Sequence, residues 1–421
     1  MEKVILGLDI GTTGISCVVL DMKNEVVLAT NTIANSAGMS PEWIFQTVKR
    51  ILDEELQQYP QITSIGITGQ MHGVLYVDAQ GQAVSPFYNW QDGRGDKNYC
   101  QEIFQKTGYT VFSGYGFATL YYNQRNQLEP PQAVSFCTIM DYVVMQLTGN
   151  RTPLMHPTNA ASLGLYLLEQ NAFDREAVGA LGLSHFSLPE IAMEPALAGT
   201  YQGIPVGVAI GDNQASFYGS VKHEENTALV NFGTGSQISA VIDHVEIVDV
   251  DAQLEIRPYL FGKYLICGSA LCGGKAYAIL ETFFSAYVGN GEQQYETMNR
   301  LAQKAYEQKS ALNVKTQFSG TRKDPELKGS ILDITENNFT PEQLILGVLQ
   351  GMAEELKQYF DAMQLDHVTQ LAASGNAMQK NPVLPLVLQD LFGLPVTLTE
   401  NKEEAAIGAA LYTRRVCYEL E

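Results

Sequence analysis

The sequence predicts an α/β protein in which one strand-turn-strand architecture occurs twice. Two segments, ILGLDIGTTGISCVVL (residues 5–20) and ALVNFGTGSQISAVI (residues 228–242), share the same pattern. Each consists of an apolar strand, a turn of glycine with threonine or serine, and a returning strand. The length of 421 residues is also more than one ordinary hydrophobic core requires. We therefore expect two duplicated domains with a boundary near residue 220.

The first half reads as strands and helices in alternation. A helical stretch from about Pro41 to Gln58 follows the opening strands, and SIGITGQM (residues 64–71) is apolar enough for a buried strand. VLYVDAQGQAV (residues 74–84) predicts a hairpin because Gln-Gly stands at its centre. VGVAIGDNQASFYGS (residues 206–220) predicts a strand that ends in a Gly-Asp-Asn break before a helix.

The second half carries the clearest helix signal of the chain. Thr340 as N-cap, Pro341 at the first helical position and Gln343 three residues after the cap predict a capping box. The helix that follows should reach about Met363. Near the C-terminus, EEAAIGAALY (residues 403–412) predicts a helix whose small residues allow close packing.

Composition excludes several classes of partner. Forty-six acidic against 26 basic residues give a net charge of -20, which is a poor match to a phosphate backbone or an anionic membrane. No apolar run reaches the roughly 18 residues of a membrane span. We therefore expect no nucleic acid and no membrane partner, and a cytoplasmic protein. The six cysteines contain no C-x-x-C pair, which favours reduced thiols over a zinc site or a disulfide framework.

The two glycine turns suggest an oxyanion ligand. A turn of glycine and threonine exposes backbone N–H groups and hydroxyls to a ligand that comes close, because glycine has no side chain. The usual nucleotide signatures, G-x-x-x-x-G-K-[ST] and a strand-linked G-x-G-x-x-G, are absent. In one interpretation both turns hold a polyphosphate across an interdomain cleft, and Asp9 binds a magnesium ion through its waters. In the other, each turn is only a tight hairpin.

Asp212 is a second candidate, because it leaves an apolar strand where a helix begins. It is either a plain N-cap or a general base that accepts the proton of a substrate hydroxyl as that hydroxyl attacks phosphorus. In the second interpretation the neighbouring Asn213 hydrogen-bonds a polyol.

A third cluster joins GQMHG (residues 69–73) with NWQDGR (residues 89–94), both at strand ends. Polar side chains beside an indole suit a sugar, whose hydroxyls need donors and acceptors and whose CH face needs an aromatic ring. The alternative for His72 is a structural histidine.

These motifs resemble those of the FGGY carbohydrate kinases, which belong to the sugar kinase, actin and Hsp70 superfamily. The resemblance covers nearly the whole chain, because the motifs occur in family order: LDIGTTG, GITGQMHG, NWQDGR, IMDYVVMQLTG, PTNAAS, IGDNQAS, VNFGTGSQ, FSGTR, ASGNAMQKNP and EEAAIGAA. It implies two actin-like (ribonuclease H-like) domains. Residues 1–220 would carry the sugar site, the magnesium and phosphate turn and the catalytic base, and residues 221–421 would bind ATP and its adenosine.

The resemblance also implies roles for single residues. Asp9 matches the magnesium-linked aspartate and Asp212 the catalytic base. The expected sugar-binding residues are Gln70, Met71, His72, Trp90, Asp92 and Asn213. The expected ATP-binding residues are Gly11, Thr12, Thr13, Gly233, Thr234, Gly235, Gly273, Gly274, Gly375, Asn376 and Asn381. Family members usually carry Lys or Arg where this chain has Ser16, so another basic residue, or magnesium alone, must balance the phosphate charge.

The activity that the resemblance implies is ATP- and magnesium-dependent phosphorylation of a terminal primary hydroxyl of a ketose. The sedoheptulokinase branch is the most similar, with sedoheptulose 7-phosphate as its product, and GQMHG also resembles xylulokinases. Xylulose or another ketose or polyol is therefore the alternative substrate. A catalytically weak regulator that binds sugar and ATP, or an Hsp70-type module, would share the nucleotide cradle. Asp212 and the sugar cluster favour the enzyme. We expect a small-molecule sugar as the partner and leave a homodimer open.

Overall fold

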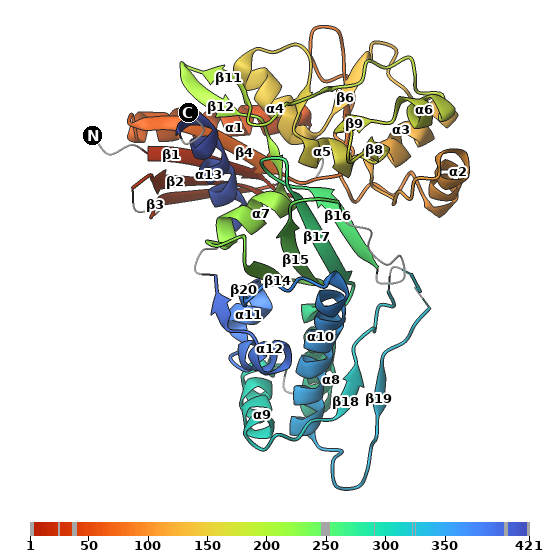
Figure 1. Cartoon of the computed structure of the whole chain (residues 1–421), viewed down its shortest axis with the longest axis vertical. Helices are drawn as coiled ribbons and strands as arrows, with labels where there is room; N and C mark the ends of the chain where they lie inside the picture. The colour runs from red at the N-terminus through yellow and green to blue at the C-terminus, as the bar shows by residue number, and fades with distance from the viewer. Residues whose placement is uncertain are drawn as a thin grey trace. The chain divides into compact units, whose positions relative to one another are not determined.

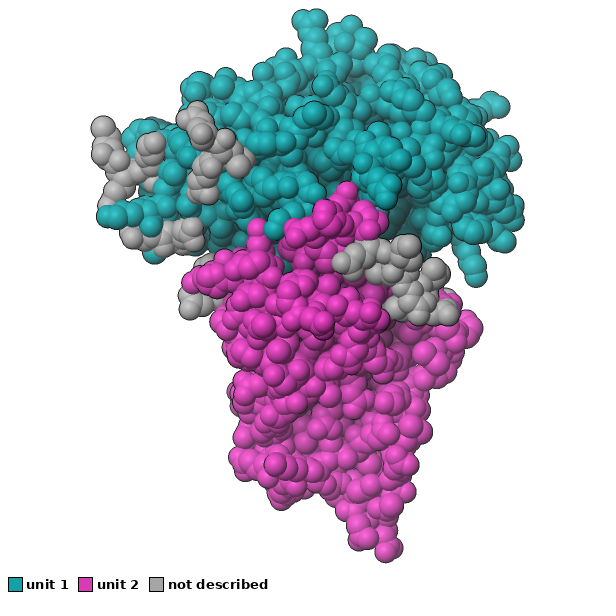
Figure 2. All heavy atoms as spheres, in the orientation of Figure 1, with its two compact units in different colours: residues 1–219, 257–263, 401–421 teal, residues 220–256, 264–400 magenta. Residues whose placement is uncertain are grey.

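The computed structural model describes residues 4–23, 26–35, 40–245, 253–289, 291–321, 323–324, 326–399 and 403–418. These residues form two compact units, which Figure 2 colours separately. Unit 1 comprises residues 1–219, 257–263 and 401–421, and unit 2 comprises residues 220–256 and 264–400. Residues 403–418 therefore belong to the same unit as residues 4–23.

The main sheet of unit 1 has the strand order β11-β12-β4-β1-β2-β3, and β13 also pairs with β4 (Figure 1). Its strands are β1 (Val4–Ile10), β2 (Gly14–Asp21), β3 (Val27–Ala34), β4 (Ile62–Gly69), β11 (Leu197–Tyr201), β12 (Ile204–Gly207) and β13 (Ile210–Gly211). The first three strands form an antiparallel meander, whereas β4 runs parallel to β1, and β13 runs parallel to β4. The strands β1, β4 and β13 therefore end at one edge of the sheet.

Alternate residues of β1 face opposite layers, as the period of two in a strand requires. Leu6 and Leu8 are buried in a core with α1 (Pro41–Gln58) and α4 (Ile139–Thr148). Ile5 is buried on the other face against α13 (Glu404–Tyr418). Because both faces are covered, the strand reads as a continuous apolar run in the sequence.

Helix α13 approaches the sheet closely because its small residues meet glycines. A Cβ on Gly7 would lie 1.9 Å from the carbonyl oxygen of Ala406, and a Cβ on Gly66 would lie 2.0 Å from that of Ala409. Only glycine leaves room for the helix at both positions. The expected packing of a small-residue helix at EEAAIGAALY is confirmed.

The rest of unit 1 lies in the sequence mainly between β4 and β11 and has its own aromatic-rich core, which includes Phe117, Phe136 and Phe173. Its elements are β5 (Leu75–Val77), α2 (Lys97–Thr107), α3 (Gly116–Arg125), β6 (Ser135–Cys137), β7 (Leu154–Met155), α5 (Pro157–Ser162), β8 (Tyr166–Leu167), β9 (Ala172–Phe173), α6 (Arg175–Ala180) and β10 (Glu190–Ile191). Helix α7 (Asp212–Ser220) follows β13.

The main sheet of unit 2 has the strand order β16-β17-β15-β14-β20-β21. Its strands are β14 (Thr227–Phe232), β15 (Ser236–Ile242), β16 (Leu254–Pro258), β17 (Tyr264–Ala270), β20 (Gln370–Ser374) and β21 (Val396–Leu398). Strands β14, β15 and β17 form an antiparallel meander and β20 runs parallel to β14. This is the pairing of β1, β2, β3 and β4 in unit 1, so the predicted duplication of an α/β architecture is confirmed.

The core of unit 2 is centred on α10 (Pro341–Met363), whose buried residues include Ile345, Met352 and Leu356. The other elements are α8 (Gly274–Val288), α9 (Tyr295–Glu307), β18 (Asn313–Lys315), β19 (Ser330–Leu332), α11 (Asn376–Lys380) and α12 (Leu384–Phe392). Over the ranges that the structure describes, no helix combines the length and apolar character that crossing a membrane would need.

Candidate functional site

Polar residues of unit 1 collect at the edge where its parallel strands end. In the sheet register Asp9 on β1 lies beside Thr68 on β4, and Thr68 lies beside Ile210 on β13. The chain leaves β4 at Gln70 and leaves β13 at Asp212. Neighbouring strands are about 4.8 Å apart, so Asp9 and Asp212 lie on either side of one strand. Two of the carboxylates singled out from the sequence are thus brought together.

The first glycine turn, between β1 and β2, is fixed by its own backbone and by Asn35. The Gly11 amide donates to the Gly14 carbonyl at 2.9 Å. The Asn35 side-chain amide donates to the carbonyls of Gly11 at 2.9 Å and Thr12 at 3.0 Å, and the Asn35 backbone amide donates to the Thr13 carbonyl at 2.9 Å. These bonds fix the backbone conformation of the turn.

Thr12 links this turn to the predicted sugar cluster. The Trp90 indole Nε1 donates to Thr12 Oγ1 at 2.8 Å, and Thr12 Oγ1 donates to Gln70 Oε1 at 3.5 Å. Gln70 Nε2 donates to the Gly11 carbonyl at 3.3 Å. The Trp90 side chain nevertheless remains 45% exposed. The structure therefore places an accessible indole directly beside the glycine turn.

Met71, His72 and Asn213 lie around the same edge. Met71 is buried and packs on Gly211, where a Cβ would lie 2.7 Å from the methionine sulfur. His72 has a positive φ of 72°, and its ring stacks on Tyr115 with the centroids 4.3 Å apart. The Asn213 side-chain oxygen accepts from Arg257 Nη1 at 3.3 Å.

Two further contacts define the sugar cluster. His72 Nδ1 lies 2.8 Å from the Ser162 carbonyl, which fixes the orientation of the imidazole. Asp92 forms an ion pair with Arg94 at 2.8 Å, and the Arg94 guanidinium lies 4.0 Å from the Tyr88 ring centroid. In the part of the chain that the structure describes, Asp92 hydrogen-bonds within its own loop, to Asn89 and Arg94, and not to Thr12 or Gln70.

The two aspartates have perturbed ionisation. Burial raises the pKa of Asp9 to about 7, and the carboxylates of Asp212 and Glu403 add to the rise. Burial also raises the pKa of Asp212 to about 6, against the opposing effects of the Asn213 backbone amide and the Arg257 guanidinium. Raised carboxyl pKa values of this kind cluster at functional sites.

A cation suits the surroundings of Asp9. Its Oδ1 is buried and has no hydrogen-bond partner, and the charged groups that raise its pKa are the carboxylates of Asp212 and Glu403. In the part of the chain that the structure describes, no three His, Cys, Asp or Glu residues are grouped as metal ligands. Magnesium, which keeps several of its own waters, is the divalent cation that needs few protein ligands.

Unit 2 contains a cavity of about 810 Å³, within the usual size range of a small-molecule pocket. Its lining includes Phe232, Gly233, Thr234, Gly274, Lys275, Tyr277, Tyr295, Asn299, Asn376, Lys380 and Asn381. The Tyr277 and Tyr295 rings stack with their centroids 6.1 Å apart. The cavity thus combines aromatic surface with a glycine turn and two lysines.

Glycines bring three segments together at this cavity. The Gly274 amide donates to the Gly233 carbonyl at 2.9 Å. A Cβ on Gly273 would lie 2.4 Å from the Gly235 carbonyl, and a Cβ on Gly375 would lie 2.4 Å from the Phe232 carbonyl. Gly375 also has a positive φ of 97°. Side chains at these positions would push the segments apart, so the glycines indicated by the sequence are required for the close approach.

Asn376 and Asn381 both lie at α11. Asn376 is the first residue of the helix, and Asn381 directly follows it. The Asn381 side-chain oxygen accepts from the amides of Val383 at 3.0 Å and Leu384 at 3.2 Å. Its side-chain amide also interacts with the Tyr277 hydroxyl, which opposes the rise in the pKa of that phenol caused by burial.

Sequence reasoning missed Arg257 and left open which residue supplies the positive charge that Ser16 lacks. Ser16 lies within β2 opposite Asp9, and its hydroxyl pairs with Thr32 Oγ1 at 3.1 Å. Arg257 supplies a positive charge near Asp212, but it is 45 positions further along the chain. No local motif connects the two, so only the fold reveals this cation.

Comparisons with known proteins agree with this architecture. Residues 4–219 match the N-terminal domain of the FGGY family of carbohydrate kinases, and residues 239–414 match its C-terminal domain. The chain is 30% identical to sedoheptulokinase from Mus musculus, covering 97% of each chain, and 29% identical to that from Homo sapiens, covering 98% of each. It also superposes on the xylulose kinase from Rhodospirillum rubrum with a TM-score of 0.86, at 19% identity, covering 100% of this chain and 92% of the other. The glycerol kinase from Plasmodium falciparum, solved with ADP, gives a TM-score of 0.84 at 19% identity, covering 100% and 90%.

Proposed function

Because the chain belongs to the FGGY family of carbohydrate kinases, we propose that it transfers the γ-phosphate of ATP to a terminal primary hydroxyl of a ketose, and that this ketose is sedoheptulose. The product would be sedoheptulose 7-phosphate. The substrate assignment rests on the similarity to the mouse and human sedoheptulokinases, which extends over at least 97% of both chains. The solved xylulose and glycerol kinases are less than 25% identical, so they support the fold and not the substrate.

Asp212 would act as the general base. Phosphoryl transfer needs little covalent chemistry from the protein, so a carboxylate that receives the hydroxyl proton and holds the hydroxyl in place suffices. A pKa of about 6 makes Asp212 a stronger base than a surface aspartate while it stays mostly ionised at neutral pH. The first position of α7 is a rigid place from which to present it.

The sugar would bind beside Asp212 at the strand ends of unit 1. Trp90 offers an exposed indole for the CH face of a sugar. Gln70, Asn213 and Asp92 offer acceptors and donors for its hydroxyls. Met71 and the oriented His72 ring complete the set that we assign to sugar binding. The domain division that we propose therefore places sugar, metal and base in residues 1–220.

Magnesium would be held at Asp9, whose buried Oδ1 lacks a partner. When bound there, the ion would offset the negative charge of the phosphates and of the neighbouring carboxylates. The Gly11, Thr12 and Thr13 turn would present its remaining backbone N–H groups to the phosphate chain.

ATP would occupy the cavity of unit 2. Gly233, Thr234 and Gly235 form the turn suited to phosphates, and Gly273 and Gly274 pack against it. Asn376 and Asn381 line the cavity, and together with Gly375 they are the residues that we assign to adenosine binding in this part of the chain. Residues 221–421 are thus proposed as the nucleotide-binding part.

The test is ADP release with magnesium and ATP across sedoheptulose, xylulose, ribulose, fructose, gluconate and glycerol. We expect the highest kcat/KM on sedoheptulose. Asp212→Asn should lower kcat by about a hundredfold or more, since general acid–base catalysis contributes 10²–10⁴-fold. Thr413→Val is the matched control, because Thr413 is a buried residue of unit 1 whose hydroxyl has no partner.

Each unexpected outcome of this assay would refute a different part of the proposed function. Preference for xylulose or glycerol would refute the sedoheptulose assignment and leave the kinase class intact. Near-normal turnover by Asp212→Asn would refute the base assignment. Absence of turnover on every sugar, with ATP still bound, would favour a sugar- and ATP-binding regulator.

A further inference from the structure

The peptide unit that leads into Asp212 is held on both sides by threonine hydroxyls. Thr68 Oγ1 donates to the Ile210 carbonyl at 2.7 Å, and the Gly211 amide donates to Thr158 Oγ1 at 2.9 Å. The Ile210 carbonyl and the Gly211 amide belong to the same planar peptide group. Its orientation therefore determines the direction in which the chain enters Asp212.

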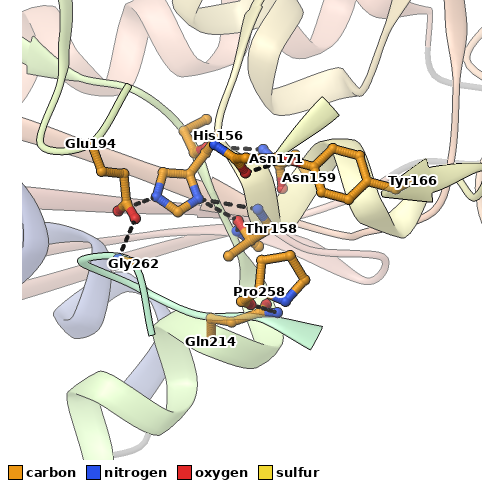
Figure 3. Close-up of polar contacts among 11 residues, drawn as sticks. His156, Thr158, Asn159, Tyr166, Asn171, Glu194, Gln214, Pro258 and Gly262 are labelled. Carbon is orange, nitrogen blue, oxygen red and sulfur yellow. Dashed lines mark hydrogen bonds and ion pairs between the residues drawn. The ribbon is translucent and has the colours of Figure 1, made fainter. Parts of the chain in front are cut away.

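Thr158 is in turn oriented by a buried histidine and glutamate, as Figure 3 shows. His156 Nδ1 lies 2.9 Å from Thr158 Oγ1 and 3.2 Å from the Thr158 amide nitrogen, and His156 Nε2 lies 2.5 Å from Glu194 Oε1. The amide can only donate, so Nδ1 accepts, and the carboxylate accepts from Nε2–H. These partners assign a neutral imidazole with its proton on Nε2.

This tautomer fixes the hydroxyl proton of Thr158. The hydroxyl donates to His156 Nδ1, and a lone pair is left to accept from the Gly211 amide. Each member of the chain thus donates to the next, from Gly211 through Thr158 and His156 to Glu194, an arrangement in which hydrogen bonds reinforce one another. Without His156 Nδ1 as acceptor, the hydroxyl would lose this fixed orientation.

The network lies inside the protein, away from solvent. His156 and Thr158 are completely buried, and the Glu194 side chain is 8% exposed. The neighbouring Asn159 is also completely buried, and its side-chain amide donates to the Ala209 carbonyl at 2.9 Å. These residues can therefore influence a reaction only through the segments that they hold next to Asp212.

Glu194 also anchors the other side of Asp212. Its Oε2 accepts from the Gly262 amide at 3.1 Å. The same short segment of unit 1 carries Pro258, whose carbonyl accepts from Gln214 Nε2 at 3.0 Å. Gln214 is two residues after Asp212. One buried carboxylate thus supports the entry to α7 and, through this segment, its first turn (Figure 3).

We propose that Thr158 is a positioning residue for Asp212, and that the buried His156 and Glu194 pair keeps its hydroxyl turned towards the Gly211 amide. This inference rests on the proposed function, in which Asp212 is the base. Asp212 itself contacts the substrate, whereas Thr158 acts only through the peptide group before it.

The experiment compares Thr158→Val and Thr158→Ser with the wild-type chain, using magnesium, ATP and sedoheptulose. Valine keeps the shape of threonine and removes the hydroxyl, whereas serine retains it. We expect Thr158→Val to lower kcat by about 10- to 100-fold, because a small misplacement of a reacting group can cost about 10² in rate. The sugar KM should stay within about threefold, since a group that acts in the transition state affects kcat. Thr158→Ser should keep kcat within about threefold of the wild type.

Two further variants keep the proposal testable if Thr158→Val does not fold. Glu194→Gln offers one acceptor oxygen where the carboxylate offers two, so it must weaken the bond to His156 or to the Gly262 amide. It should lower kcat with little change in KM. Thr413→Val, the buried control in the same unit, should leave both constants unchanged. Thermal unfolding of each variant reports whether it is folded at the assay temperature.

The positioning role is refuted if folded Thr158→Val keeps a kcat within threefold of the wild type, or if Thr158→Ser is impaired as strongly as Thr158→Val. It is also refuted if Thr413→Val loses as much activity, because the effect would then be general. Asp212→Asn separates the two hypotheses. An inactive Asp212→Asn beside a fully active Thr158→Val overturns only the positioning role, whereas an active Asp212→Asn overturns the base assignment and this inference with it.

Discussion

Replacing Asp141 by asparagine should change how the stability of unit 1 depends on pH. Asp141 on α4 is 1% exposed. Its Oδ2 accepts from Thr138 Oγ1 at 2.6 Å, and its Oδ1 accepts from Asn159 Nδ2 at 3.0 Å. Burial raises the pKa of Asp141 to about 7, although both hydrogen bonds oppose the rise. Asparagine has nearly the same shape and cannot ionise, so the pH dependence that Asp141 causes is absent from the variant.

The sign and size of this pH dependence follow from the difference between the pKa of Asp141 in the folded and in the unfolded chain. The ordinary pKa of Asp141 is 3.8 and its folded pKa is about 7, so between these values the folded chain keeps a proton that the unfolded chain releases. The free energy of unfolding therefore falls as pH rises through this window, by about 1.4 kcal/mol per pH unit. The total loss is about 4 kcal/mol, complete above pH 7. Asp141→Asn lacks this loss, so its stability relative to the wild type should increase from pH 5 to pH 8.

Urea unfolding followed by tryptophan fluorescence measures this effect in the full chain. Both tryptophans, Trp43 and Trp90, lie in unit 1, so their emission reports on the unit that contains Asp141. Other carboxyl groups titrate as well, and the difference between Asp141→Asn and the wild type at each pH removes their contribution. The exposed Glu169 provides the control Glu169→Gln, which should follow the wild type. The reasoning would be refuted if the free energies of unfolding of Asp141→Asn and the wild type changed in parallel with pH.

Three further predictions follow from single contacts. Gly66→Ala should lower the free energy of unfolding of unit 1 by about 3 kcal/mol or more, because its Cβ would lie 2.0 Å from the Ala409 carbonyl. A decrease below about 1 kcal/mol, measured by urea unfolding, would contradict this prediction. With Asp212 as base and its pKa at about 6, kcat should fall about tenfold per unit below pH 6, and a rate unchanged at pH 4.5 would contradict the assignment. Gly375→Ala should weaken ADP binding about tenfold in calorimetry, because its Cβ would meet the Phe232 carbonyl, while tryptophan-detected unfolding stays the same.

The strongly patterned elements could be predicted from the sequence. The helix from Pro41 to Gln58 and the repeated hairpins occur where the apolar periodicity and turn residues place them. The capping box was only half right. Thr340 does accept from the Gln343 amide at 3.4 Å, but the Gln343 side chain donates to Ser310 Oγ at 2.6 Å. A tertiary partner therefore replaced the local one that the motif requires.

Contacts between distant segments could not be predicted, because no local pattern encodes them. The packing of the C-terminal helix α13 against Gly7 and Gly66 depends on the complementary fit of two surfaces far apart in sequence. Similarly, His156 and Glu194 carry no shared motif, and their bond appears only once the chain has folded. Asp9, Gln70 and Asp212 could be predicted as candidates because each lies at or next to the end of a strand, whereas the network that supports Asp212 could not be predicted.

The duplicated sheets carry different side chains at corresponding positions. Asp9 and Asn231 occupy corresponding places, each two residues before the first glycine of its turn. In unit 2 the Asn231 side-chain amide donates to Ser374 Oγ on the neighbouring parallel strand at 2.7 Å. The amide of Asn231 therefore has a neutral hydrogen-bond partner within its own sheet. In unit 1 the hydroxyl on the neighbouring strand, Thr68, is used by the Ile210 carbonyl, and Asp9 Oδ1 is left buried without a partner. The bond that fixes the approach to Asp212 is therefore also the one that leaves Asp9 available for a cation, so Thr68 supports both acidic residues of the proposed site.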